Sequence, residues 1–471
     1  MSSSHQPHED EPINEDDNEM FDPADAAEEI EDVDGDAAMD SGDDDVDVGA
    51  GEDELMQEEY QLQNDSAAHF DHHKDSIFCI AQHPTRPEIV ATGEPTPVLP
   101  ASYQSNPSER IERRGLEPIF KLEGHTDSIN ALAFTLPDGR FLLSGGLDGR
   151  LRAYVTNGSR WKFYTEAQEV EEVNWLTACP YEKFPNTFAL GANDGSVWVY
   201  TVDPSQKEAP LQMIQSYFLH TESCTAGAWS PDGKLLATVS EDGSLYVWDV
   251  FGEAAAAGLT QGESGQTVVG LTALDQRFAV EGGLFSVGIA PSGAFVAVGG
   301  AGGSIKVVGL PRLGDGSGAA PAGRAGAGAA SKNKGGKQGG GKATQGDGIE
   351  SIAFAQPPLT LMAAGSVDGS IALFDSAHRF AVRRHIKEAH EEYSIVKVEF
   401  VKNSQSGGWL LTSCGMDGVV RRWDTRGGTG IANSGFVREW KGHRGDGEGG
   451  GVLGFVQGDG SRIVTRGRRW N

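Results

Sequence analysis

Cysteine is scarce in this chain of 471 residues. The four cysteines stand far apart in the sequence, at Cys79, Cys179, Cys224 and Cys414. They form no CxxC pair, and no group of His and Cys has the spacing of a zinc site. We therefore expect neither a disulfide framework nor a metal or other cofactor. Each cysteine lies in or beside an apolar strand pattern, which predicts reduced, buried thiols in an intracellular protein.

Long apolar runs are also missing. No stretch approaches the roughly 18–20 residues that a membrane-spanning helix needs. The first residues, MSSSHQPHEDEP, are polar and acidic, unlike a signal peptide. These absences predict a soluble protein that makes no membrane contact.

The first 64 residues lack Lys and Arg altogether but contain 25 of the 69 acidic residues. The rest of the chain has 44 acidic and 38 basic residues, so most of the net charge of −31 belongs to this segment. It has few large apolar residues, and burial cannot offset the entropy of ordering it. We expect residues 1–64 to be a disordered acidic tail in front of a folded domain at 65–471.

What the sequence does have is a repeat. Alternation with period two marks short strands, and DG pairs mark tight turns between them. The clearest block is HTESCTAGAWSPDGKLLATVSEDGSLYVWDV at 220–250, and related blocks occupy 124–154, 348–375 and 394–424. This is the pattern of the WD40 repeat, in which four strands form one blade of a propeller. Eight blocks predict an all-β, eight-bladed propeller, with seven blades as the alternative.

In the clearest block, His220, Ser240, Asp242 and Trp248 have the spacing of the hydrogen-bonded tetrad that pins a WD40 blade. The same residue types also occur in Ser/His/Asp catalytic triads. The set recurs in degraded form in the block at 124–154, as a scaffold element would, and no GxSxG motif accompanies it. The tetrad therefore predicts scaffolding, and we expect no catalytic residue.

Three stretches interrupt the repeat. Residues 95–117 are rich in proline, which cannot donate to a strand ladder, and predict a loop. Residues 311–346 are rich in Gly, Ala and Lys and predict a flexible insertion, either inert or in contact with RNA, although no aromatic residue is present to stack on bases. The last block stops at Asn471, where a further strand is expected. Residues 60–70 are expected to supply the outer strand of that last blade. The first and last blocks indicate either a thin seam or a sequence that is incomplete there.

Carboxylates recur at one position of the repeat. Every block has an acidic residue two or three positions before the first apolar residue of its first strand. In a propeller these strands begin around one mouth of the central channel, so the acids form a ring. The predicted members are Asp75, Asp127, Glu171, Glu222, Glu281, Asp347, Glu392 and Glu448, with Glu166, Glu169 and Glu172 added at the third block.

One acid at such a position is often only a solvated turn residue. Eight converging acids, however, cost stability and create a negative potential that attracts and steers cations. A negative mouth disfavours DNA and RNA, whose phosphates need Lys and Arg. It suits an Arg/Lys-rich peptide instead, and we predict that the acidic residues bind such a partner.

The segments EVEEVNWLTACP (169–180), GSVDGSIALFD (365–375) and CGMDGVVRRWDTRGG (414–428), behind an acidic tail, resemble the family of angio-associated migratory cell protein and its fungal ribosome-assembly counterpart. The similarity covers about residues 65–470. It implies an eight-bladed propeller that acts as a dedicated chaperone. Fungal members bind the N-terminal segment of a new, basic ribosomal protein of the large subunit (eukaryotic L-ten, universal L-sixteen). They deliver this protein for late assembly of the subunit in the cytoplasm.

The leading hypothesis is therefore a monomeric, cytoplasmic, non-enzymatic chaperone that binds a basic ribosomal protein on its acidic face. A general scaffold in signalling or cytoskeletal regulation, as in the animal members, is the first alternative. A substrate receptor of a ubiquitin ligase is the second.

Overall fold

The computed structural model describes most of one compact unit, Gln61–Asn471. The described residues are 64–70, 72–73, 76–93, 98–100, 114–157, 160–261, 265–313, 327–329, 347–402, 407–426, 435–443 and 450–467. Apart from Asn64, the predicted acidic tail lies outside these residues. The predicted partner-binding residues Asp75 and Glu448 also lie outside them.

Most strands belong to antiparallel sheets of four, in which consecutive strands pair. The fourth sheet shows why: β15 (Cys224–Trp229), β16 (Leu235–Ser240) and β17 (Leu245–Asp249) alternate apolar and small residues, with short turns between them. Gly243, in the DG turn between β16 and β17, has a φ of 75°, a left-handed conformation that glycine adopts without strain. The prediction of an all-β repeat fold is confirmed.

Seven such sheets follow one another along the described chain. The first contains β2 (Cys79–Gln82), β3 (Val90–Gly93), β4 (Val98–Pro100) and β6 (Pro118–Lys121). The second contains β7 (Ile129–Phe134), β8 (Phe141–Gly146), β9 (Leu151–Asn157) and β10 (Arg160–Ala167). The third contains β11 (Val173–Ala178), β12 (Thr187–Ala192), β13 (Val197–Val202) and β14 (Leu211–Tyr217). The fourth is completed by β18 (Thr267–Leu271).

The fifth sheet contains β19 (Leu284–Ile289), β20 (Phe295–Gly300), β21 (Ile305–Gly309) and β22 (Ala327–Ala329). The sixth contains β23 (Ile349–Phe354), β24 (Leu361–Ser366), β25 (Ile371–Asp375) and β26 (Ala381–Ile386). The seventh contains β28 (Ile395–Phe400), β29 (Leu410–Gly415), β30 (Val419–Asp424) and β31 (Phe436–Lys441). A last sheet has the two strands β32 (Val452–Val456) and β33 (Val464–Gly467).

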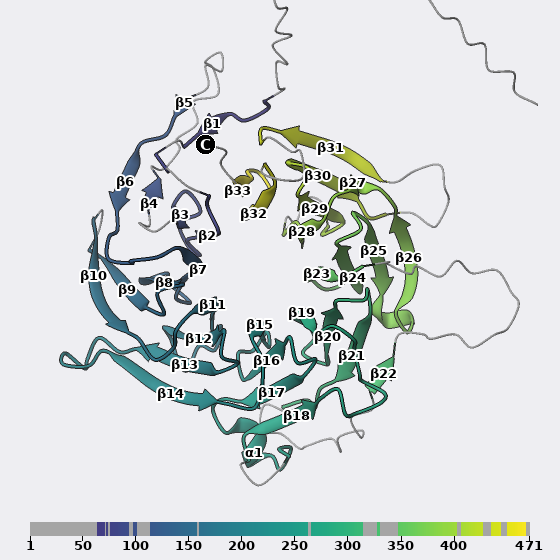
Figure 1. The fold of residues 1–471 in the computed structure, drawn as a ribbon, viewed down its shortest axis with the longest axis horizontal. Helices are drawn as coiled ribbons and strands as arrows, with labels where there is room; N and C mark the ends of the chain where they lie inside the picture. Colours follow the sequence, from purple (N-terminus) through teal and green to yellow (C-terminus); the bar gives the residue numbers. More distant parts are fainter. Residues whose placement is uncertain are drawn as a thin grey trace, which may run out of the picture. The chain divides into compact units, whose positions relative to one another are not determined.

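The first strands of these sheets line the centre of a closed ring (Figure 1). Each contacts the next, in the order β2, β7, β11, β15, β19, β23, β28 and β32, and β32 contacts β2 again. The described residues thus place eight sheets in the ring, of which the last has two strands. A complete eighth blade stays a prediction.

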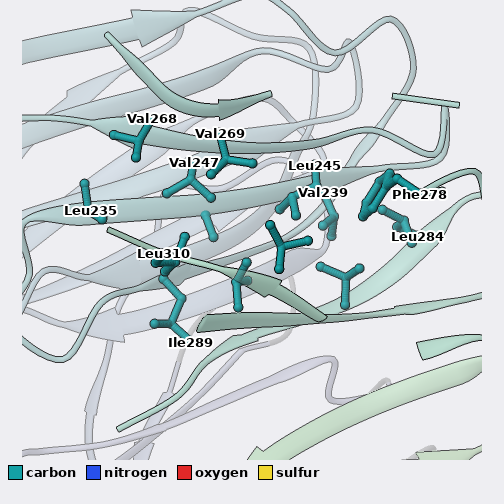
Figure 2. Packing of buried hydrophobic residues seen from close by; sticks show 14 of the residues in the cluster. Leu235, Val239, Leu245, Val247, Val268, Val269, Phe278, Leu284, Ile289 and Leu310 are labelled. Atoms are coloured by element: carbon teal, nitrogen blue, oxygen red, sulfur yellow. The ribbon is translucent and has the colours of Figure 1, made fainter. Parts of the chain in front are cut away.

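The core lies between neighbouring sheets. Every residue of the second strands β8, β12, β16 and β24 is buried, because these strands have a strand on each side and a sheet against each face. Figure 2 shows one such layer, where Leu235 and Val247 of the fourth sheet lie with Leu284 and Ile289 of the fifth. Burial of each of these side chains stabilises the fold by about 1.5–3 kcal/mol. The packing fixes where each first strand begins.

The structure corrects three expectations at the interruptions of the repeat. The proline-rich stretch 95–117 contains β4 and also β5 (Arg114–Gly115), because its prolines flank the paired residues Val98 and Leu99 and do not separate them. The insertion 311–346 contributes β22 to the fifth sheet, and most of the remainder lies outside the described residues. Within residues 60–70, β1 (Ala68–His69) pairs with β5 and not with the last sheet.

Connections differ in length between the two ends of the ring. From the second to the eighth position in the repeat order, the turn that joins the second and third strands of a four-stranded sheet has three or four residues, as at 147–150 and 416–418. At the opposite end the connections range from 2 residues, 158–159, to 17 residues, 250–266. The longer of these contains the short helix α1 (Glu253–Ala256).

Candidate peptide-binding face

The predicted acids lie in the short segments that lead into the first strands, which we call lead-in segments. One backbone hydrogen bond recurs in them: the residue directly before the strand accepts, through its carbonyl oxygen, from the turn between the second and third strands. Leu147 N–H donates to the Ser128 carbonyl at 2.9 Å, and Val367 N–H to the Gly348 carbonyl at 2.9 Å. The bond is present in six sheets, with acceptors Ser128, Glu172, Ser223, Gly283, Gly348 and Ser394. The acid stands one or two residues before the acceptor.

The lead-in segment of each sheet also packs against the preceding sheet. A Cβ added at Gly195, in the turn between β12 and β13, would lie 2.6 Å from the carbonyl oxygen of Glu222 in the next sheet. A Cβ at Gly149 would lie 2.7 Å from the Glu171 carbonyl, and one at Gly369 would lie 2.2 Å from the Glu391 carbonyl. The lead-in segments and these turns therefore form one continuous surface, which we call the lead-in face.

The carboxylates on this face are uncompensated. Glu172 is half-buried, and the other described members of the predicted set are exposed. Among the described residues, none of them makes an ion pair within 4.0 Å. The described members are Asp127, Glu169, Glu171, Glu172, Glu222, Glu281, Asp347 and Glu392. Their mutual repulsion leaves a negative potential available to a cationic partner.

Glu166, which the sequence adds to the same cluster, is different. It lies in β10 directly opposite Arg152 of β9, and Arg152 Nη1 donates to Glu166 Oε2 at 2.5 Å. Arg150 Nη1 is 3.9 Å from the same oxygen. Glu166 is therefore already neutralised within its own sheet, and its expected contribution to the acidic cluster is wrong.

A second ring of side chains follows inside the first strands. In seven of them the ladder to the second strand slips by one residue directly after the first strand residue. Such a bulge releases one residue from regular pairing and re-aims its side chain. The released residues are Asn130, Asn174, Thr225, Phe285, Glu350, Val396 and Leu453.

Two of these residues join neighbouring first strands. Asn174 Nδ2 donates to the Cys224 carbonyl at 3.0 Å, and Thr225 Oγ1 donates to the Leu284 carbonyl at 2.6 Å. The bulge position therefore lies on the inner wall of the ring, beside the lead-in face.

Glu350 is the acidic residue at this position. Burial in the protein that surrounds it raises the pKa of its carboxyl group, although the side chain keeps contact with solvent. It makes no ion pair among the described residues. Sequence reasoning missed Glu350 because it lies inside the strand. Its signal was the motif IES, which puts an acid where the other blocks have an uncharged residue.

The tetrads hold the lead-in segments from behind. In the second sheet His125 hydrogen-bonds Asp148 at 3.0 Å and Ser144 at 2.7 Å, as the repeat predicts. The seventh sheet has the full set: His390 hydrogen-bonds Asp417 at 2.9 Å and Ser413 at 2.7 Å, and Trp423 Nε1 donates to Ser413 at 2.8 Å.

The predicted tetrad of the fourth sheet is wrong in one member. Thr238, and not Ser240, hydrogen-bonds His220 Nε2 at 2.8 Å and accepts from Trp248 Nε1 at 2.9 Å. The hydroxyl position is four residues before Asp242, as it is in the second and seventh sheets, so the prediction slipped by two residues along the strand. Ser240 instead donates to the Glu222 carbonyl at 3.0 Å. It therefore holds the backbone of a predicted binding residue.

Ser244 connects the remaining members of this tetrad. Its hydroxyl hydrogen-bonds His220 Nδ1 at 2.6 Å and donates to Asp242. Burial lowers the pKa of His220 to about 4, although the nearby carboxylate of Asp242 opposes the shift. His220 is thus neutral at physiological pH and serves as a structural link.

The four cysteines are buried and unpaired, as predicted, and burial raises the pKa of each thiol to about 12. Within the described ranges, no three His, Cys, Asp or Glu side chains are grouped so as to hold a metal ion. In the same ranges, no helix has the length and apolar character to cross a membrane.

Comparison with known proteins agrees with this architecture. Residues 116–154, 211–249 and 383–424 match the WD domain, G-beta repeat family. The structure matches that of Sqt1 from Chaetomium thermophilum with a TM-score of 0.75 and 56% identity, over 86% of this chain and 96% of the other. The chain belongs to the Sqt1 family. In a second structure of the same Sqt1, matched with the same identity and TM-score over 98% of that chain, the protein is bound to the N-terminus of ribosomal protein L10.

More distant relatives are similar over smaller or less identical parts. The ribosome assembly protein SQT1 of Saccharomyces cerevisiae is 30% identical over 226 residues, which is 45% of this chain and 49% of that protein. The aligned part thus spans about half of the yeast relative. Human angio-associated migratory cell protein is 24% identical over 414 residues, 85% of this chain and 78% of the relative. The predicted resemblance to this family and to Sqt1 is confirmed.

Proposed function

We propose that this protein is a dedicated chaperone of a large-subunit ribosomal protein, and that it binds the basic N-terminal segment of that protein on the lead-in face. The observation that carries the proposal is the set of uncompensated carboxylates there, on a chain 56% identical to an Sqt1 whose structure holds the N-terminus of L10. The chaperone acts by binding and not by catalysis. It works as a monomer in the cytoplasm and releases its cargo for late assembly of the subunit.

Charge complementarity supports this assignment physically. A segment rich in Lys and Arg would otherwise bind any exposed RNA, because phosphate neutralisation is largely independent of sequence. The carboxylates of the lead-in face take the place of phosphates and steer the segment onto the ring. Ribosomal RNA offers more charge at the assembly site, and competition with it drives release.

Two layers of the face have different roles in this proposal. The exposed outer acids, such as Glu171 and Glu222, govern the association rate and the dependence on salt. Glu350, at the inner wall, is placed to pair with one cation of the cargo. Because burial already disfavours its charge, a cation that arrives there relieves a cost and forms a charge-assisted hydrogen bond.

The test is a triple charge reversal, Glu171→Lys, Glu172→Lys and Glu222→Lys. A synthetic peptide with the sequence of the L10 N-terminus serves as the probe, and its Kd is measured by fluorescence anisotropy. We expect binding to weaken more than about tenfold at low salt, with a smaller difference at high salt, where screening is strong.

The matched control reverses three exposed acids at the opposite end of the strands: Asp138, Glu182 and Glu208. It changes the net charge by the same amount, so the two variants separate a local site from a general charge effect. Equal loss in both variants, or no loss in the first, contradicts the assignment of this face. Affinity purification of the tagged chain then identifies the natural cargo. Recovery of a ligase core or of cytoskeletal regulators, without a ribosomal protein, contradicts the chaperone function.

A further inference from the structure

Two large apolar side chains stand in solvent on the lead-in segment of the fourth sheet. Phe218 is 64% exposed and Leu219 is 49% exposed, directly before buried His220. Single exposed apolar residues are ordinary on protein surfaces. These two, however, adjoin half-buried Trp198 of β13, whose ring meets that of Phe218 edge-on at 5.5 Å. We call Phe218, Leu219 and Trp198 the apolar step.

Carboxylates flank the apolar step. Glu169 and Trp198 line the same narrow crevice between the second and third sheets. The crevice holds about 10 Å³, room for one water molecule, so the step is a raised surface and not an open pocket. Glu222 follows Leu219 by three residues on the same lead-in segment. Glu169 and Glu222 are exposed and make no ion pair within the part of the chain that the structure describes.

This juxtaposition has a physical consequence for selectivity. Carboxylates alone attract any segment rich in Lys and Arg, and salt weakens that attraction. Apolar contact does not depend on charge, and aromatic edges and faces add a geometric preference. A surface that alternates the two distinguishes a segment that carries both cations and bulky apolar residues from one that carries cations only.

We propose that the apolar step is a specificity subsite of the lead-in face. It takes a bulky apolar or aromatic side chain of the bound segment, while neighbouring cations of that segment pair with Glu169 and Glu222. The occupant is thus a basic segment with at least one large apolar residue. This inference rests on the proposed function insofar as it places the ribosomal cargo at the step.

The experiment combines the double variant Phe218→Ser, Leu219→Ser with two pairs of peptides. The first pair is the L10 N-terminal segment and a version in which Ser replaces its bulky apolar residues. The second pair alternates Arg with Tyr and Arg with Ser. Wild type is expected to bind the apolar member of each pair about tenfold more tightly, and the variant to lose this preference at low and high salt alike. Binding of the Ser-containing peptides is unchanged.

Leu274→Ser is the matched control, because Leu274 is 93% exposed and lies in another lead-in segment. It is expected to bind all peptides like wild type. Since Phe218 touches Trp198, the single variant Leu219→Ser, whose side chain makes no ring contact, guards against a folding defect.

Three outcomes overturn the inference. One is an equal loss for all peptides, and another is an unchanged preference in the double variant. The third is a wild-type dimer, seen by sedimentation velocity, that the variant abolishes, since the step is then a contact between two copies of the chain. If wild type fails to bind the L10 peptide but keeps the preference for the Arg/Tyr peptide, the proposed cargo is wrong and the subsite stands.

Discussion

Replacement of Glu350 by Gln tests the inner layer of the lead-in face by removing one charge at almost constant volume. The side chain sits at the bulge of β23, on the inner wall of the ring, and has no ion pair among the described residues. We expect opposite effects on stability and on binding. The free protein gains stability at neutral pH, whereas its affinity for the basic peptide falls.

The sign of the stability effect follows from the raised pKa of Glu350. Between the pKa of the unfolded chain and the higher pKa of the folded one, the folded state holds the proton more tightly. Stability in this window therefore falls as pH rises, and the full cost is present above the folded pKa. Gln carries no charge and avoids this cost. The variant is thus more stable than wild type at neutral pH and equal to it below the unfolded pKa.

The size of the binding effect follows from the contact that is lost. A hydrogen bond to a charged group contributes about 1.5–3 kcal/mol, which corresponds to roughly 10–100-fold in Kd. Isothermal titration with the L10 peptide measures the affinity, and urea unfolding at neutral and acidic pH measures the stability. Glu182→Gln, at the opposite end of the strands, is the control for loss of one exposed charge.

A Glu350→Gln variant that binds the peptide like wild type refutes the role of this residue as an anchor. A variant that is less stable than wild type at neutral pH refutes the reasoning from burial, because it means that the charged carboxylate is favoured in the free protein.

Three further predictions concern the scaffold behind the face. Thr238→Val removes the hydroxyl that joins His220 and Trp248, and should cost about 2–4 kcal/mol in urea unfolding. Ser240→Ala should cost less than about 1 kcal/mol and leave that tetrad intact, which reverses the order expected from the sequence. Because burial holds the pKa of His220 at about 4, the unfolded chain binds a proton below about pH 6.5 while the folded chain does not, so roughly 3 kcal/mol of stability is lost as pH falls from 6.5 to 4. Unfolding free energies that stay level across this range contradict it. Glu166→Gln should change peptide affinity less than about twofold, since Arg152 already neutralises that carboxylate; a loss as large as that of the charge reversals contradicts this view.

The repeat pattern predicted the ring and the positions of the outer acids, because both depend on local chemistry. DG turns and period-two alternation define strands one block at a time. The acids stand at a constant distance from each first strand, so a correct block assignment places them as well. Pairing between blocks was not predictable in this way: residues 68–69 bind β5, although their position before the first block favoured the last sheet.

Two details of the site escaped sequence reasoning for a common reason. Thr238 and Ser240 are both hydroxyl residues two apart on one strand, so they share a face, and only the observed hydrogen bonds separate their roles. Glu350 stands where regular alternation assigns a side chain to the ladder, and only the bulge reveals its release to the inner wall. Neither the partners of a side chain nor a slip in register is encoded in hydrophobic periodicity.

The unequal connections at the two ends of the ring have an evolutionary consequence. Turns of three or four residues support the carboxylates, and a glycine such as Gly195 leaves no space for a longer or bulkier turn against the next sheet. The other end accepts connections of up to 17 residues, including a helix. Insertions can therefore accumulate at that end without disturbing recognition. A lineage can acquire new surfaces there while it keeps an old cargo.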